Sequence, residues 1–420
     1  MNYELLNEII ATMRRNKLRT ALTGFAVAWG IFMLIFLLGA GNGLINAQRK
    51  GMDRFLANSM MVGGGVTTKA HDGLPEGRYI TLDDDDISTT KRAFADNVDE
   101  AGGMISQSSV TINHGADYVS STMRGVAPNY AAVEKVQMLS GRFINELDMS
   151  ESRRVVVLSD NDAKELMPRR ADMIVGQYLT VSGMTFKVVG IYKSDNTDMN
   201  TETYVPFTTL QTIYGKGRQA DNIIFTFHGL ESEAANDAFE AQYKARLNLN
   251  HRAAPDDEGS VWIWNRFKQN LQMSTGITII QTALWVIGLL TLVSGIVGVS
   301  NIMLITVKER TREFGIRKAI GARPGAILKL IIVESVAMTT FFGYIGMMLG
   351  MAANMYMDAT IGHETVNVGP FEATVFLDPT VGFGTCVGAT VVMVVAGTLA
   401  GLVPALKAAR IRPIEALRAE

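Results

Sequence analysis

The sequence has few of the residues that build metal centres and cofactor sites. Its single cysteine, Cys386, excludes an intramolecular disulfide and any metal site made of several thiolates, and it falls in an apolar run where we expect it to be buried. The five histidines are widely separated and none lies in an HExxH pattern, so we expect no bound metal. No GxxxxGK[ST] or GxGxxG stretch occurs. We therefore expect no cofactor and no catalytic activity on this chain.

An acidic run at residues 83–86 is the one local candidate for calcium. It lacks the alternating ligands and the glycine of a calcium-binding loop. It also stands where a predicted helix begins, and negative charge is favourable at a helix N-terminus. The sequence therefore favours helix capping over calcium binding.

Charge is almost absent from four long stretches, at residues 20–48, 269–307, 335–357 and 379–406. Each exceeds the roughly 20 residues that a helix needs to cross a membrane. The hydrophobic share of 48%, with 40 Gly and 23 Met, is typical of such segments. A cleaved signal peptide is the alternative for the first stretch, but its apolar run is longer than a signal core. The sequence predicts four transmembrane helices.

Basic residues cluster at alternate ends of these stretches, which would place them all on the same side of a membrane. They lie before the first stretch, in the segment 308–329 between the second and third, and after the last; residues 358–378 contain no Lys or Arg. Lys and Arg accumulate in cytoplasmic loops. We therefore expect both termini in the cytoplasm and a large extracytoplasmic domain at residues 49–268.

The spans contain almost no ionisable residues and many small ones. Glu334, near the inner end of the third span, is the exception. An ion-coupled transporter normally keeps a charged residue within the membrane, so the absence of charge from the centres of the spans argues against this class. Small residues recur four apart, which lets helices pack closely. These pairs are Gly39 and Gly43, Ser294 and Gly298, Gly346 and Gly350, Gly384 and Gly388, and Gly397 and Gly401.

The second apolar stretch is longer than a membrane is thick. A helix over 269–307 extends about 58 Å, nearly twice the hydrocarbon thickness. Trp285 is expected near the outer headgroups, with a stalk beyond it that pairs with the end of the first helix. A break at Gly276 and Gly288, or a strong tilt, is the alternative. The residues expected to carry motion along the stalk are Ala47, Asn270, Gln272, Met273 and Trp285.

The extracytoplasmic segment has the pattern of a mixed α/β domain. Strands are expected at 59–66, 104–112, 222–227 and 261–264, with helices at 83–94 and 231–247. This is a βαβ-like set divided by an insert. The insert, about 126–207, contains expected strands at 154–158, 178–181 and 185–191, punctuated by Gly176, Gly183 and Gly190.

The segment 308–329, KERTREFGIRKAIGARPGAILK, carries seven Lys or Arg against two Glu. Glu313 and Arg317 are spaced i,i+4, Ile316 and Ile320 share a face, and Gly321 is placed to end a short helix before Pro324 opens the next. A short amphipathic helix just inside the membrane is suited to docking a cytoplasmic partner.

Within this segment, ERTREFGIRKAIGA resembles the signature of the FtsX-like permease family, which includes MacB-type and lipoprotein-releasing ABC transporter permeases. LSGRFINELDMSESRRVVVLSD, GQYLTVSGMTFKVVGIY and the terminal PALKAARIRPIEAL extend the resemblance over nearly the whole chain. It implies an α-helical membrane protein with four transmembrane helices and a mixed α/β extracytoplasmic domain, whose porter-like part is interrupted by a β-rich one. The expected order is first span to residue 48, extracytoplasmic domain 49–268 (porter-like 55–125 and 208–265, insert 126–207), stalk and second span 269–307, coupling segment 308–329, third span 330–357, outer loop 358–378, fourth span 379–406 and cytoplasmic end 407–420.

The resemblance also implies a function. The chain is expected to be a permease subunit that exports a drug, peptide or lipoprotein by mechanotransmission. It lacks the nucleotide-binding loop that MacB itself carries, so the resemblance is to the members of the family that use a separate ATPase subunit. A separate cytoplasmic ATPase would bind ATP and Mg, and the permease would form a dimer in the bacterial inner membrane, with a possible periplasmic adaptor and outer-membrane duct. A regulator of a cell-wall hydrolase and a passive membrane-anchored receptor are the alternatives. The expected ATPase-coupling residues are Glu309, Arg310, Arg312, Glu313, Gly315, Ile316, Arg317, Lys318, Ile320 and Gly321.

Overall fold

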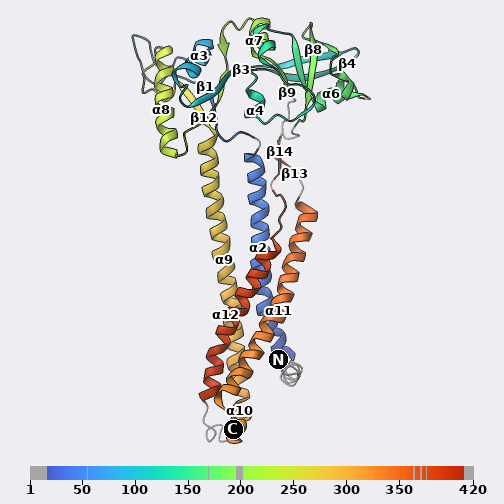
Figure 1. The fold of residues 1–420 in the computed structure, drawn as a ribbon, viewed down its shortest axis with the longest axis vertical. Helices are drawn as coiled ribbons and strands as arrows, with labels where there is room; N and C mark the ends of the chain where they lie inside the picture. Colours follow the sequence, from blue (N-terminus) through green and yellow to red (C-terminus); the bar gives the residue numbers. More distant parts are fainter. Residues whose placement is uncertain are drawn as a thin grey trace. The chain divides into compact units, whose positions relative to one another are not determined.

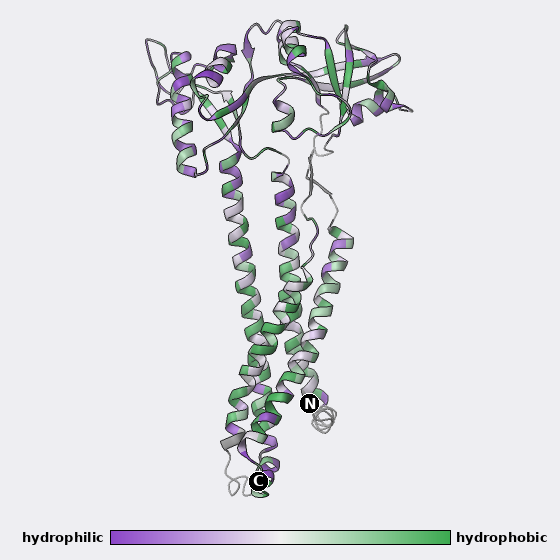
Figure 2. Ribbon diagram, viewed as in Figure 1, coloured by the Kyte–Doolittle hydropathy of each residue, from purple (hydrophilic) through white to green (hydrophobic). Residues whose placement is uncertain are grey.

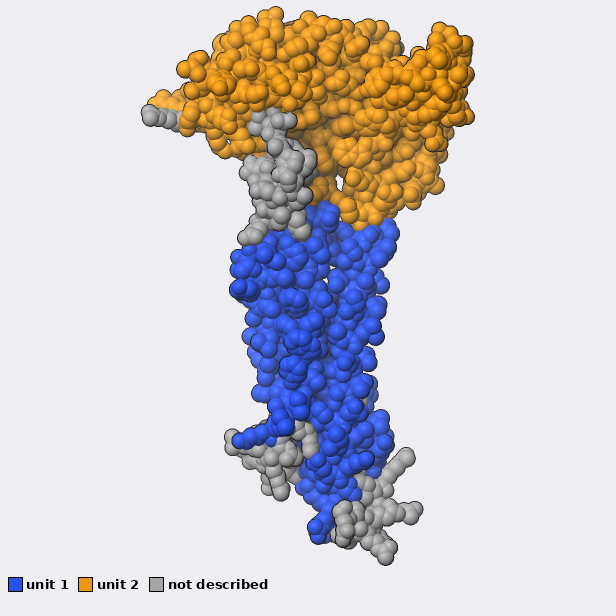
Figure 3. All heavy atoms as spheres, turned by 180° about the vertical axis from the view of Figure 1, so that it is seen from behind, with its two compact units in different colours: residues 1–49, 275–366, 374–420 blue, residues 50–274, 367–373 orange. Residues whose placement is uncertain are grey.

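The computed structural model describes residues 17–53, 55–168, 170–194, 202–362, 365–368, 371–374 and 376–410. The chain forms two compact units, which Figure 3 shows in separate colours. The helical unit comprises residues 1–49, 275–366 and 374–420, and the α/β unit comprises residues 50–274 and 367–373. Of the basic residues that flank the apolar stretches, those at positions 14, 15, 412 and 418 lie outside the described residues.

Four helices of the described chain are long and apolar enough to cross a membrane, as predicted. They are α2 (Lys17–Met52), α9 (Arg266–Glu309), α11 (Pro324–Ile361) and α12 (Phe383–Arg410). Figure 2 shows hydrophobic residues along most of their length. Pro324 opens α11, so this helix starts well before the apolar stretch at residue 335. The predicted fold class is confirmed.

Helix α9 is continuous over 44 residues, or about 66 Å. It runs through Gly276 and Gly288 without interruption, so the alternative of a break at these glycines is wrong. Trp285 lies on α9 with 43% of its surface exposed.

Small residues bring the helices of the helical unit together. A Cβ added at Gly346 of α11 would lie 2.4 Å from the carbonyl oxygen of Ala28 in α2, and one at Gly397 of α12 would lie 2.5 Å from the Thr339 side chain in α11. The Ser335 hydroxyl donates a hydrogen bond to the Gly397 carbonyl at 3.2 Å. These approaches explain two of the predicted small-residue pairs.

The first half of the α/β unit is a split βαβ arrangement (Figure 1). Its strands follow the order β12-β1-β11-β3, and each neighbouring pair is antiparallel. Helices α3 and α8 connect β1 to β3 and β11 to β12, so the predicted βαβ-like set is confirmed. The bounds are β1 (Ser59–Gly64), α3 (Asp84–Ala93), β3 (Val98–His114), β11 (Asn222–Phe227), α8 (Glu233–Asn250) and β12 (Val261–Asn265).

The insert continues the same sheet. Strand β3 is 17 residues long, much longer than the predicted 104–112, and a bulge between Gln107 and Val110 bends it into the second half. The sheet then follows the order β4-β9-β6-β8-β5, with β7 paired to β3 and β8. Gly190 lies inside β8 next to a register shift, within the strand predicted at 185–191. These strands are β4 (Asp117–Val126), β5 (Met138–Gly141), β6 (Val155–Ser159), β7 (Tyr178–Val181), β8 (Met184–Tyr192) and β9 (Glu202–Pro206).

Short elements complete the part of the chain that the structure describes. They are β2 (Leu82–Asp83), α4 (Tyr130–Val133), α5 (Glu146–Ser150), α6 (Asp160–Leu166), the 3-10 helix η1 (Ala171–Ile174), α7 (Phe207–Ile213), β10 (Gln219–Ala220), β13 (Thr365–Val368) and β14 (Phe371–Thr374).

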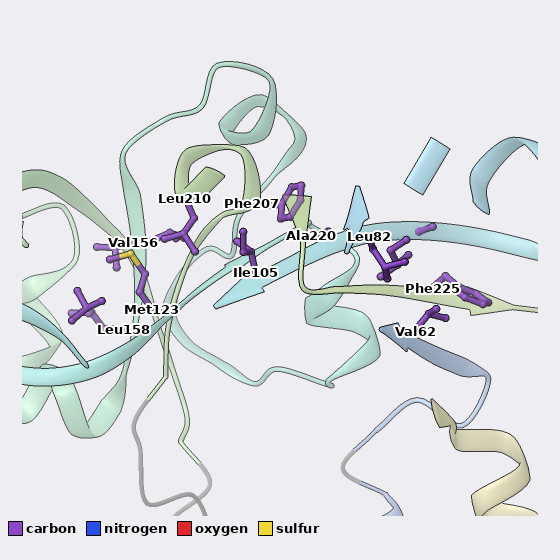
Figure 4. Packing of buried hydrophobic residues seen from close by; sticks show 14 of the residues in the cluster. Val62, Leu82, Ile105, Met123, Val156, Leu158, Phe207, Leu210, Ala220 and Phe225 are labelled. Carbon is purple, nitrogen blue, oxygen red and sulfur yellow. The ribbon is translucent and has the colours of Figure 1, made fainter. Parts of the chain in front are cut away.

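One hydrophobic core extends through both halves of the α/β unit. Figure 4 shows Val62 and Phe225 of the first half in the same cluster as Met123, Val156 and Leu158 of the second. These side chains are at most 1% exposed. Because a common core covers one sheet, we expect the two halves to unfold together.

The acidic run at residues 83–86 caps α3, as predicted. The Asp83 side chain accepts hydrogen bonds from the amides of Asp85 and Asp86, and Asp86 accepts one from the amide of Asp83. The buried Asp86 carboxylate also lies 2.7 Å from His251 Nε2 at the end of α8. This hydrogen bond raises the pKa of His251 above its ordinary value.

Candidate coupling site

The segment between α9 and α11 folds as the short helix α10 (Thr311–Ala319). Arg310 separates it from the end of α9. At its other end Gly321 has φ +99°, and the amides of Gly321 and Ala322 donate to the carbonyls of Lys318 and Arg317. This pairing closes a helix C-terminus and requires a left-handed residue, which glycine provides without strain. The sequence prediction of a short, glycine-terminated helix is confirmed.

Arg310 joins α10 to α11. Its guanidinium donates to both carboxylate oxygens of Glu313, at 2.9 and 3.1 Å, and to Glu334 of α11 at 3.3 Å. Its Cζ lies 5.1 Å from the centre of the Phe314 ring. Arg317 donates to Glu313 at 2.8 Å, which is the predicted i,i+4 pair. One carboxylate therefore accepts from two guanidinium groups across the first turns of α10.

These contacts affect the charge of Glu313. The hydrogen bond from Arg310, followed by the charges of Arg310 and Arg317, holds the pKa of Glu313 below its ordinary value. The carboxylate therefore stays ionised at neutral pH, and the ion pairs that brace α10 persist.

One face of α10 is buried in the helical unit. Phe314 is 1% exposed and belongs to the same cluster as Val307, Ile327 and Ile331. Gly315 is also buried. Gly315 is one of the expected coupling residues, and its burial means that other residues of this chain surround it. A bulky side chain there would disturb the packing of the helical unit.

The opposite face of α10 is open. Arg312 is exposed, Ile316 is 42% exposed and Ile320 is 82% exposed. Two large apolar side chains one helical turn apart, in a segment rich in charge, form a small hydrophobic surface. We call Arg312, Ile316 and Ile320 the exposed face of α10.

The other predicted coupling residues lie around this face. Glu309 at the end of α9 is exposed, as is Gly321 after α10, and Lys318 is half-buried. A groove of about 510 Å³ lies nearby between the ends of α9 and α12. Its lining includes Lys308, Thr311 and Lys407.

The predicted stalk residues lie along α2 and α9. Ala47 of α2 is 8% exposed. On α9, Gln272 is exposed while Asn270 and Met273 are half-buried. The role expected for the stalk residues depends on the length and continuity of the two helices.

Sequence reasoning missed Phe314 and Glu334 as members of the coupling site. Phe314 is the one aromatic residue of the segment 308–329, and its spacing from Arg310 was a usable signal. Glu334 was noted only as an isolated charge. Its contact with Arg310 spans 24 residues and depends on how α10 folds back on α11.

The comparisons with known proteins cover both units. Residues 20–246 match the MacB-like periplasmic core domain, and residues 285–413 match the FtsX-like permease C-terminal domain. The macrolide export ATP-binding/permease protein MacB of Bdellovibrio bacteriovorus is 25% identical over 99% of this chain and 62% of its own length. This chain therefore spans less than two thirds of that relative.

Two further matches are to a permease and to a solved domain. The uncharacterized ABC transporter permease YknZ of Bacillus subtilis is 30% identical over 71% of this chain and 70% of its own length. The crystal structure of the periplasmic region of MacB from Actinobacillus actinomycetemcomitans is 18% identical, with a TM-score of 0.42 over 53% of this chain and 96% of that one.

Proposed function

We propose a coupling role for this chain, which belongs to the family of ABC transporter permeases that combine a MacB-like periplasmic core domain with an FtsX-like permease C-terminal domain. It is an inner-membrane protein of this type. In our proposal both termini lie in the cytoplasm and the α/β unit lies outside. The positive flanks of the spans support this orientation.

The exposed face of α10 is the observation that carries the proposal. Ile316 and Ile320 provide an apolar contact, and Arg310 with Glu313 fixes the helix that presents it. A rigid element transmits displacement better than a mobile loop. We propose that a cytoplasmic ATPase subunit, which binds ATP and Mg, contacts this face. The Bacillus subtilis relative, which is named as an ABC transporter permease, supports a separate ATPase chain.

Helix α9 supplies a continuous path for motion. Its 44 residues contain no proline and no break. We propose that two copies of the permease form a dimer. In each copy, movement of α10 is carried along α9 and α2 to the extracytoplasmic domain. This mechanotransmission would export a drug, peptide or lipoprotein, with or without an adaptor and an outer-membrane duct. A passive receptor would need no such element, and a hydrolase regulator would use the same motor.

The experiment replaces the apolar contact by charge. The double variant Ile316→Glu/Ile320→Glu, co-expressed with its ATPase partner, should lose ATPase co-purification and ATP-dependent export. The matched control Ile316→Leu/Ile320→Leu keeps the apolar area and should retain both. Because both side chains are exposed, neither change disturbs the core. Full ATPase binding and export by the glutamate variant would refute the proposed contact.

A further inference from the structure

The α/β unit contains a cavity of about 620 Å³ that the coupling mechanism does not use. This volume is in the range of small-molecule sites. Its lining comes from segments far apart in the sequence, including α4, β9 and the junction of β12 with α9 (Figure 1). All of the lining residues belong to the α/β unit.

Three tyrosines form one wall of the cavity. The ring centres of Tyr130 and Tyr192 lie 5.3 and 4.8 Å from that of Tyr204. Burial raises the pKa of all three hydroxyls above the ordinary value, so they remain neutral. Their hydrogen bonds fix the rings: Tyr192 donates to the Glu202 carbonyl at 2.7 Å, and Tyr130 accepts from Arg124 at 3.0 Å. The wall is aromatic and preorganised.

The charges inside the cavity occur in pairs. Arg124 pairs with Glu202, and Arg266 pairs with Glu134 at 2.5 Å. The Arg266 guanidinium is 3% exposed and lies 4.2 Å from the centre of the Phe55 ring. Because each buried guanidinium already faces a carboxylate, the interior has no excess of either sign.

The excess charge comes from three exposed lysines of the lining. Lys50, Lys135 and Lys193 are exposed, whereas Asp53 is the one exposed carboxylate among the described lining residues. The whole lining has five basic and three acidic side chains. A concave site with excess charge of one sign attracts ligands of the opposite sign. The lysines therefore favour an anion.

We propose that this cavity binds an amphipathic organic anion. An aromatic or apolar body would lie against Tyr130, Tyr204 and Val136, and a carboxylate, sulfonate or phosphate would lie near Lys135 and Lys193. The binding does not depend on an ATPase, so the proposal goes beyond the coupling function. It also places the ligand against Trp264 and Arg266, where β12 ends and α9 begins.

The test compares two probes that share a benzophenone body and carry opposite charges. The full chain in nanodiscs of zwitterionic lipid is photolabelled with 4-benzoylbenzoate or with 4-benzoylbenzylamine, and the labelled peptides are identified by mass spectrometry. We expect saturable labelling of the peptides that contain Met61 and Val136, both of which line the cavity. The acid should label them roughly fivefold more strongly than the amine. Equal labelling by the two probes, or no saturable labelling of these peptides, would overturn the proposal.

Variants connect the labelling to the cavity. Lys135→Glu/Lys193→Glu should reverse the preference from acid to amine, whereas Lys91→Glu, an exposed lysine of α3 outside the lining, should not change it. Val136→Trp fills the cavity and should abolish labelling by both probes. Thermal unfolding of each variant separates a blocked cavity from a misfolded chain. If Val136→Trp misfolds, the lysine variant still decides, because an unchanged preference would refute the site.

Discussion

The contact between Arg310 and Glu334 can be tested by a double-mutant cycle. The two side chains are 16% and 10% exposed, and Arg310 also holds Glu313 through two hydrogen bonds. Loss of one partner from a buried ion pair costs about 3 to 5 kcal/mol because the other charge is left uncompensated. For this slightly exposed pair we expect a smaller cost, about 2 to 3 kcal/mol, for Arg310→Met.

The cycle predicts an asymmetry between the two single variants. Glu334→Met leaves Arg310 paired with Glu313, so it should destabilise the chain less than Arg310→Met does. We expect a cost of about 1 kcal/mol for Glu334→Met. In the double variant Arg310→Met/Glu334→Met, Glu313 keeps its bond from Arg317. The double variant should therefore be less destabilised than the sum of the singles, with a coupling energy of about 1 to 2 kcal/mol.

The first assay is thermal unfolding of the full chain in one detergent at one scan rate. The second measures how far the permease stimulates the ATP hydrolysis of its ATPase partner in the reconstituted complex. Arg310→Met should lower both the unfolding midpoint and the stimulation, because the ion pair with Glu334 that helps to hold α10 against α11 is lost. Additive effects of the two substitutions would refute the energetic link between these helices. Full stimulation by Arg310→Met would refute the role of the brace in coupling.

Three further predictions concern pH, topology and the stalk. The raised pKa of His251 means that its pair with Asp86 stabilises the fold fully below about pH 6.5, the pKa of an unperturbed histidine, and that this contribution is lost as the pH rises through the folded pKa. The thermal unfolding midpoint of the wild type should therefore fall over that pH range, whereas the midpoint of His251→Asn should not. In a cysteine-free background, an impermeant maleimide should label Lys91→Cys but not Ala322→Cys in intact spheroplasts, and equal labelling would contradict the proposed orientation. Gln272→Pro should cost about 3 kcal/mol of local helix stability and abolish export while the ATPase stays bound, whereas Gln272→Ala should export normally.

The sequence predicted the elements whose residues interact locally. The apolar stretches, the four-residue spacing of Glu313 and Arg317, and the acidic cap of α3 each depend on neighbours within a few turns. Strands β7 and β11 have the predicted bounds because turn signals flank them on both sides. The full length of β3 was missed because its first residues, 98–103, pair with β11 and its last two, 113 and 114, pair with β4.

The sites were predictable only in part for the same reason. The exposed face of α10 follows from one amphipathic helix, but the burial of Gly315 depends on the surrounding helices. The cavity of the α/β unit collects Arg124, Tyr204 and Arg266 from three separate strands and helices. No local pattern relates such residues, so the cavity could not be inferred before the strand order was known.

The two long helices that enter the α/β unit are connected to its sheet in different ways. Residues 53–58 separate the end of α2 from β1, whereas β12 ends at Asn265 and α9 begins at the next residue. The side-chain amide of Asn265 donates to the side-chain oxygens of Asn236 and Glu240 in α8, at 2.8 and 2.7 Å. A connecting segment can absorb a change of backbone angle, but a junction without one cannot. A twist of α9 about its own axis must therefore deform the sheet or break these bonds, while α2 can slide or turn with less resistance.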